Sequence, residues 1–350
     1  MQNRALALRA ATGLAVVSLI AAPLAGCSGA TSALPTAAAS SLADAKTTAS
    51  APGSTQWSAQ PDAHHKKVKQ LLFVSDNENN RVLVYNTATK TQNPPALRTI
   101  TNGVQGPNGL ATDESGNLYV ANYLSNTVTV YAPNAGNPKT TISNGLNGPF
   151  DVKVDGFGNV YVANDPLSGG TPFIQLYPVG SSSPTYTWSA PASGEVISGL
   201  ALLNPKQQGQ TAIYALEFSL NGSGFATGGA LSCYPGNPTC VSFGSTFGQT
   251  GGIAVAQSPG GSKPFQWLAV DQYVPGVDIF TQGQANGQIT TGGTPEFITL
   301  NSTGNQLYVA DRFYGRVVEY SYPAGKQLNT FTPGGAQVYG VATSPAGTFH

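Results

Sequence analysis

The amino-acid sequence predicts an all-β fold assembled from six copies of one four-stranded unit. The first observation is a repeated segment made of a short strand, a turn with Gly-Asn, and a second, almost continuously apolar strand. The second observation is a third strand that recurs six times and ends each time on an aromatic residue. Weaker fourth strands and Gly-Pro corners separate the units. Repetition at intervals of roughly 42 to 53 residues is typical of a six-bladed β-propeller.

The first two strands of the unit are clearest in residues 109–122, 151–164 and 297–311. We expect the Gly and the Asn of the intervening turn to supply positive-φ positions for a tight hairpin. The second strand reads Leu/Val-Tyr-Val-Ala, which predicts burial on both faces.

The third strand sets the number of blades. Its terminal aromatic residue suits a half-buried position between stacked sheets. The six copies are residues 81–85, 127–131, 173–177, 230–234, 276–280 and 316–320.

The two ends of the repeated region are complementary. Residues 340–344 look like a first strand without a second, and residues 71–75 look like a second strand without a first. We therefore expect the C-terminal strand to complete the first blade, which protects sheet edges that an open array would expose. This assigns residues 68–350 to one propeller domain.

The second and third strands also resemble a known repeat. Phe73-Val-Ser-Asp76 is followed by Asn80-Arg81-Val82, and Tyr308-Val-Ala-Asp311 is followed by Gly315-Arg316-Val317. These segments are similar to the NHL repeat of six-bladed propellers. The resemblance covers most of the domain and implies its architecture, whereas a propeller hosts many functions.

The N-terminal residues indicate export. Arg4 and Arg9 precede an apolar run over residues 10–22, and Leu24-Ala25-Gly26-Cys27 follows. Charge, apolar run and small residues are typical of a secretory signal over residues 1–26. The last four residues resemble the lipobox of bacterial lipoproteins, which implies cleavage before Cys27 and lipidation of Cys27. An ordinary signal peptide with an incidental Cys is the alternative.

The resemblance to lipoproteins implies a lipid-anchored, extracytoplasmic protein of the bacterial cell envelope. Ser28 rather than Asp after the lipidated residue favours the outer membrane in a bacterium with two membranes. Residues 27–67 are rich in Ala, Ser, Thr and Pro, and we expect them to form a disordered tether. Cys233 and Cys240 remain as an even pair in an oxidising compartment, which predicts a disulfide.

Composition excludes some functions. Lys and Arg number 16, Asp and Glu number 16, and the formal net charge is zero. A nucleic-acid partner needs a basic surface, so we expect none. The three His, at positions 64, 65 and 350, lie outside the repeats, so a propeller lyase that resembles virginiamycin B lyase is also excluded.

Polar residues near the strand ends are the first candidate site. The loops after the second strands and the loops between blades share one face, so these side chains are expected to surround the mouth of the channel. They offer hard ligands to a metal such as calcium or to a polar ligand; alternatively, each bonds the backbone N–H groups of its own loop. The residues are Asp76, Asn108, Asn122, Asp151, Asn164, Glu217, Asp271 and Asp311.

Two of these residues resemble part of an enzyme site. Pro107-Asn108-Gly109 is similar to a segment of gluconolactonase-like calcium lactonases in which the Asn binds the metal, and Asp151 holds a similar position in the next blade. The metal-binding Glu of that family has no clear counterpart. The resemblance implies, as an alternative function, a calcium-dependent hydrolase or lyase for a small ester or lactone.

Aromatic residues on the same face favour a different function. The sequence predicts no catalytic residue and requires no cofactor, so we expect a non-catalytic module for an envelope protein or a glycan. The expected rim residues are Tyr123, Phe218, Tyr273, Phe313 and Tyr314.

Overall fold

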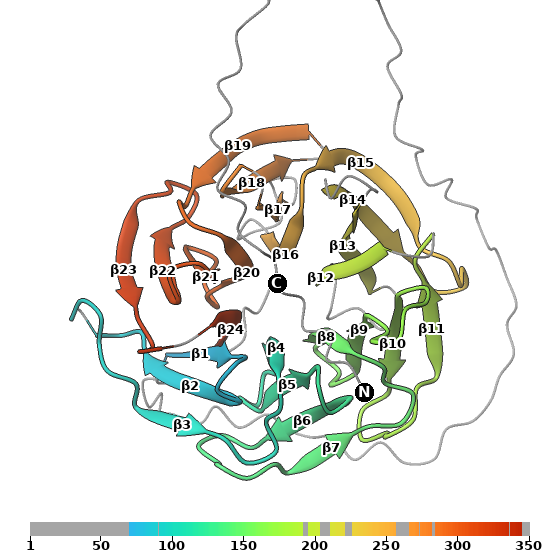
Figure 1. Cartoon of the computed structure of the whole chain (residues 1–350), viewed down its shortest axis with the longest axis horizontal. Helices are drawn as coiled ribbons and strands as arrows, with labels where there is room; N and C mark the ends of the chain where they lie inside the picture. The colour runs from blue at the N-terminus through green and yellow to red at the C-terminus, as the bar shows by residue number, and fades with distance from the viewer. Residues whose placement is uncertain are drawn as a thin grey trace, which may run out of the picture. The chain divides into compact units, whose positions relative to one another are not determined.

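Six four-stranded antiparallel sheets surround a central axis (Figure 1). This computed structural model describes residues 70–344 except 90, 192–194, 204–210, 221–225, 257–265, 273, 282–283 and 336. The innermost strands are β4 (Pro107–Thr112), β8 (Pro149–Val154), β12 (Glu195–Leu203), β16 (Thr250–Ala256), β20 (Pro295–Leu300) and β24 (Val338–Ser344). Each of them contacts the innermost strands of both neighbouring sheets. The predicted six-bladed β-propeller is confirmed.

The remaining strands follow outward in chain order. The second strands are β1 (Leu71–Asp76), β5 (Leu118–Asn122), β9 (Val160–Asn164), β13 (Ala212–Leu220), β17 (Gln266–Asp271) and β21 (Gln306–Asp311). The third strands are β2 (Arg81–Asn86), β6 (Thr127–Tyr131), β10 (Phe173–Tyr177), β14 (Ala226–Cys233), β18 (Gly276–Thr281) and β22 (Arg316–Ser321). The outer strands are β3 (Arg98–Ile100), β7 (Thr140–Ile142), β11 (Tyr186–Ser189), β15 (Val241–Phe247), β19 (Gln284–Thr290) and β23 (Gln327–Phe331).

The C-terminal strand closes the ring as predicted. Strand β24 pairs antiparallel with β1, so that Leu72 lies opposite Thr343 and Val74 lies opposite Val341. The first sheet therefore combines the two ends of the repeated region, and the order of its strands is β24-β1-β2-β3.

The turns between the first and second strands differ in one detail from the prediction. Gly116 and Gly158 have φ angles of 79° and 85°, whereas the Asn that follows each of them does not adopt a positive φ. Instead, the Asn117 backbone N–H donates to Asp113 Oδ1 (2.8 Å) and its side-chain amide donates to Asp113 Oδ2 (2.7 Å). The Gly supplies the backbone conformation, and the Asn and Asp hold the turn.

The aromatic residues of the third strands are more buried than expected. Five of the six are buried, because a neighbouring blade covers each of them. The hydroxyl of Tyr131 donates to the carbonyl oxygen of Asn102 (2.6 Å), and that of Tyr177 donates to Asn144 (2.7 Å). The exception, Tyr234, lies beyond the end of β14 and is exposed.

The hydrophobic core is divided among the interfaces between blades. Six clusters of buried apolar side chains occur, one between each pair of neighbouring sheets. Each blade thus buries both faces, which accounts for the continuously apolar second strands. Within the described residues, we find no helix with the length and apolar character needed to cross a membrane.

Candidate functional site

Polar side chains at the ends of four second strands hold the loops that lead into their own blades. Each side-chain oxygen accepts a backbone N–H from the loop before the innermost strand, and each acceptor residue is buried. The pairs are Asn122 with Gln105 (3.0 Å), Asn164 with Asn147 (3.0 Å), Asp311 with Thr294 (3.1 Å) and Asp76 with Gln337 (3.2 Å). These hydrogen bonds satisfy backbone donors that would otherwise be costly to bury.

The two acidic members of this group also form ion pairs with the third strand. Arg81 Nε lies 2.6 Å from Asp76 Oδ2, and Arg316 Nε lies 3.1 Å from Asp311 Oδ2. The carboxylates of Asp76 and Asp311 thus each accept hydrogen bonds from a backbone N–H and from a guanidinium group.

Two other candidates in this set occupy different positions. Asp271 is half-buried at the end of β17 and accepts the backbone N–H of Val274 (3.3 Å) in its own loop. Glu217 lies inside β13 rather than at its end, because that strand continues to Leu220. Ser242 donates a hydrogen bond to Glu217 Oε1 (3.3 Å).

The residues suggested by the lactonase resemblance do not fit a calcium site. Asn108 Oδ1 accepts a hydrogen bond from the side-chain amide of Asn77 (2.8 Å). Asp151 accepts hydrogen bonds from the Lys153 ammonium at 2.7 and 2.8 Å and from the backbone N–H of Leu200 at 2.8 Å. Calcium needs six to eight oxygen ligands, and the described residues contain no group of three or more His, Cys, Asp or Glu that could hold a metal.

Two carboxyl groups of the third blade have perturbed pKa values. Burial raises the pKa of Asp151, and the Lys153 ammonium opposes this shift. Burial raises the pKa of Asp165 to about 6, while a hydrogen bond with the Tyr123 hydroxyl opposes the rise. Burial disfavours the charged form of a carboxyl group, which accounts for the direction of both shifts.

Five of the exposed large apolar side chains lie on one face of the propeller. We call them the apolar ring, and each lies in a loop between a second and a third strand. Its members are Leu124, Leu167, Val274, Phe313 and Tyr314. They come from four different blades, and Phe313 is the most exposed at 72%. Several exposed apolar residues on one face make that face a candidate interaction site.

The expected rim residues therefore have different environments. Phe313 and Tyr314 are exposed and their rings contact each other edge to face, with centroids 4.9 Å apart. Tyr123 lies in a loop of the same face but is half-buried. Phe218 lies within strand β13 and is half-buried, and Tyr273 lies outside the described residues.

Two aromatic residues that the sequence analysis missed cross the mouth of the channel. Strands β8 and β20 lie on opposite sides of the axis (Figure 1). The rings of Phe150 on β8 and Phe297 on β20 nevertheless lie only 5.9 Å apart, and Tyr123 packs edge to face on Phe150 at 6.1 Å. This aromatic cover spans the channel on the face that carries the apolar ring.

The sequence holds one signal for Phe297, because most other blades have a glycine at the equivalent position. Equivalent positions on the innermost strands hold Gly109, Gly199, Gly252 and Gly340. A Cβ on Gly109 would lie 2.7 Å from the Cα of Asp151, and one on Gly252 would lie 2.9 Å from the Cα of Phe297. The innermost strands therefore approach each other closely. Two blades lack this glycine: β8 has Asp151 at the equivalent position and β20 has Phe297.

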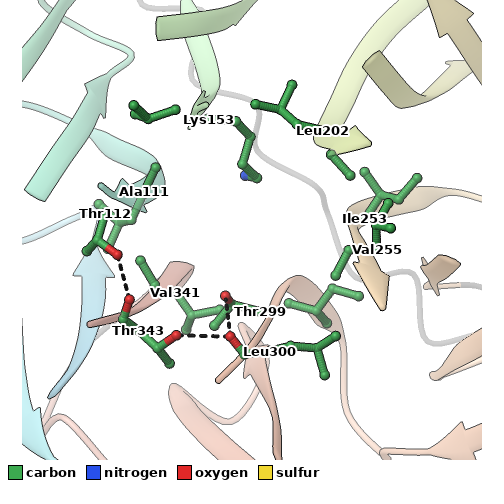
Figure 2. A pocket seen from close by; sticks show the side chains of 16 residues that line it. Ala111, Thr112, Lys153, Leu202, Ile253, Val255, Thr299, Leu300, Val341 and Thr343 are labelled. Atoms are coloured by element: carbon green, nitrogen blue, oxygen red, sulfur yellow. Dashed lines mark hydrogen bonds between the residues drawn. The ribbon is translucent and has the colours of Figure 1, made fainter. Parts of the chain in front are cut away.

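The interior of the channel is a cavity of about 130 Å³ (Figure 2). All six innermost strands line it, mostly with Ala, Val, Leu and Ile side chains. Lys153 is the charged residue among the lining residues, and its amine points into the open interior (Figure 2). The Thr112 and Thr343 hydroxyls donate to carbonyl oxygens of neighbouring innermost strands, at 2.6 and 2.9 Å.

The predicted disulfide is present. Cys233 and Cys240 are bonded to each other, and both are buried in the core between the third and fourth blades. The bond closes the turn after β14, as the Pro- and Gly-rich segment between the two residues indicates.

Comparisons with known proteins define the class of fold. No family model and no curated protein matches the sequence. A chain from the crystal structure of a nidogen/laminin complex is similar, with a TM-score of 0.59 and 16% identity over 79% of this chain and 98% of that one. Hydrazine synthase of Kuenenia stuttgartiensis is similar with a TM-score of 0.50 and 16% identity, over 71% of this chain and 72% of that one. The likeness to these structures shows the fold alone.

Proposed function

We propose that this chain is a non-catalytic binding module of the bacterial cell envelope. A lipid on Cys27 holds it at a membrane, and the apolar ring binds a protein partner. The observation that carries the proposal is the presentation of exposed apolar side chains by four blades on one face. Exposed aromatic residues are the side chains that dominate the energy of protein interfaces.

The aromatic cover favours a protein over a small molecule as the partner on this face. The contact between Phe150 and Phe297 lies across the channel mouth, so the apolar ring surrounds a covered surface rather than an open pocket. A broad surface with exposed apolar groups suits a macromolecule that docks across it. The NHL resemblance and the similar propeller from a nidogen/laminin complex are consistent with this proposal.

Site-specific photo-crosslinking in intact cells tests the partner. A photoreactive residue is placed at Leu124 or Phe313 in the apolar ring, and at Phe157 or Val179 as matched controls. The control residues are also exposed and apolar, but lie in loops at the other ends of the strands.

We expect both ring positions to crosslink to one common protein, and the controls not to do so. Replacing Phe313 and Tyr314 together by Ser should abolish the crosslink from position 124 and change stability by less than about 0.5 kcal/mol. Equal crosslinking from the controls, or crosslinking to carbohydrate alone, would refute a protein-binding ring.

The proposed anchor has a separate test. Cys27 lies outside the described residues, and the proposal rests on the basic, apolar and Leu-Ala-Gly-Cys pattern that precedes it. Cells that express the wild type or Cys27→Ser are labelled with a fatty acid. The label should appear on the wild-type protein and be lost from the variant; an unlabelled, soluble wild-type protein would contradict the anchor.

A further inference from the structure

The channel interior breaks the repeat at one position. Equivalent residues of the six innermost strands line the channel, and five of them are small. The six equivalent residues are Ala111, Lys153, Ala201, Ala254, Thr299 and Ala342, and Lys153 is the large one. A single long, charged side chain therefore extends into a space that small residues leave open (Figure 2).

Three hydrogen bonds hold the Lys153 ammonium in place, and the weakest of them could be exchanged for a ligand. The ammonium donates to both oxygens of Asp151, and its remaining contact, to the carbonyl oxygen of Val152, is longer at 3.2 Å. Asp151 also accepts the backbone N–H groups of Val152 and Leu200, both at 2.8 Å. The carboxylate therefore stays stabilised if the ammonium redirects one N–H into the channel.

We infer that the channel is a binding site for a small monocarboxylate with an unbranched apolar body. Lys153 donates a charge-assisted hydrogen bond to the carboxylate, and the aliphatic walls contact the alkyl chain. A cavity of about 150 Å³ holds a molecule the size of benzene, so a chain of about four to six carbon atoms suits this one. Lys153 is the charged residue of the lining, and a ligand carboxylate would share its ammonium with Asp151.

This site is distinct from the proposed protein-binding face. Phe150 and Phe297 cover the channel on the side of the apolar ring. The ligand therefore enters from the side of Thr112 and Thr343, where the first strands end. Failure of the protein-binding proposal would leave this one intact, and the reverse is also true.

Calorimetric titration of the full chain with three matched probes tests the site. Pentanoate, pentanol and pentylamine share an alkyl chain and differ in charge. We expect pentanoate to bind at least about tenfold more tightly than either of the others, because only it gains the ammonium.

Three variants locate the binding. Lys153→Met combined with Asp151→Asn removes both charges together, and should weaken pentanoate binding about tenfold while leaving pentanol unaffected. Ala254→Leu fills the channel without touching the charged pair, and should abolish binding of all three probes. Lys139→Met removes an exposed Lys outside the channel and serves as the matched control.

Two results would overturn the inference. Equal binding of pentanoate and pentanol would show an apolar cavity without recognition of an anion. Pentanoate binding that is undetectable at millimolar concentration, or unaffected by Ala254→Leu, would show that the channel is not the site. A folded double variant, verified by its thermal melting, makes either result decisive.

Discussion

The ends of the second strands and the innermost strands use buried polar residues differently. Polar side chains recur at the strand ends, where Asn122 and Asp311, for example, each accept an N–H from the loop that leads into their blade. Asp151 and Lys153 occur on one innermost strand, and the equivalent positions of most other blades hold Gly and Ala. A repeated polar residue solves a problem that every blade shares, which is the satisfaction of backbone donors in a loop. Asp151 also accepts a backbone N–H, from Leu200, but the equivalent positions of the other blades do without such an acceptor, so the unrepeated pair is the better candidate for a function.

The largest effect is expected from breaking the repeated architecture itself. Deleting residues 338–350 removes β24, so β1 loses its antiparallel neighbour and becomes an exposed edge. Thermal unfolding should lose its cooperativity, or the protein should aggregate. Deletion of residues 28–60 serves as the control and should leave the melting temperature unchanged. A fully stable protein without β24 would mean that the ring does not depend on this strand.

The unrepeated charged pair gives the next largest effect. Lys153→Met leaves the Asp151 carboxylate buried without its ammonium partner, and should cost about 3–5 kcal/mol at pH 7. Urea unfolding measures this loss. Adding Asp151→Asn should restore most of the stability, because the neutral pair still accepts the Leu200 N–H.

The single variant should also depend on pH. Burial already raises the pKa of Asp151 above that of the unfolded chain, and removal of the ammonium raises it further. The folded variant then binds a proton more tightly than the unfolded chain, so its stability should fall as pH rises. A single variant as stable as the wild type would show that the pair contributes nothing.

A repeated strand-end residue should have a smaller effect. Asp76→Ala removes the acceptor for the Gln337 N–H and the partner of Arg81, and should cost about 1–3 kcal/mol. Asp76→Asn keeps an acceptor oxygen and should cost less, which chemical denaturation of both variants would show. Binding of the proposed partner to the folded Asp76→Ala variant should be unchanged. Loss of that binding would show that Asp76 takes part in partner recognition.

The smallest effect concerns Asp165 beside Tyr123. Its pKa is about 6 in the folded protein and 3.8 in the reference state, so its protonated form favours folding. This contribution is complete below about pH 4 and is lost as pH rises through about 6. After solvent screening it should amount to about 1–2 kcal/mol. Asp165→Asn should flatten the stability of the protein between pH 4 and 7, and an unchanged pH profile would contradict the assignment.

The architecture could be predicted from the sequence because strands and turns are local patterns. The apolar second strands, the Gly at the hairpin turns and the six aromatic-ended third strands each act over a few residues, and repetition multiplied the signal. The incomplete units at the two ends also predicted that β24 would pair with β1. Local hydrogen bonds to Asn and Asp, including that of Asp113 with Asn117, follow from short sequence separation as well.

The residues that meet on the axis depend on the assembled ring. Phe150 and Phe297 belong to opposite blades, and ring closure brings their side chains within 5.9 Å although nothing in either segment specifies the other. The same closure turns Lys153, one residue of an ordinary strand, into the charged group of an apolar channel. Side-chain environment in a ring depends on all six blades at once. A single repeat therefore predicts the blade, and the assembled propeller determines the site.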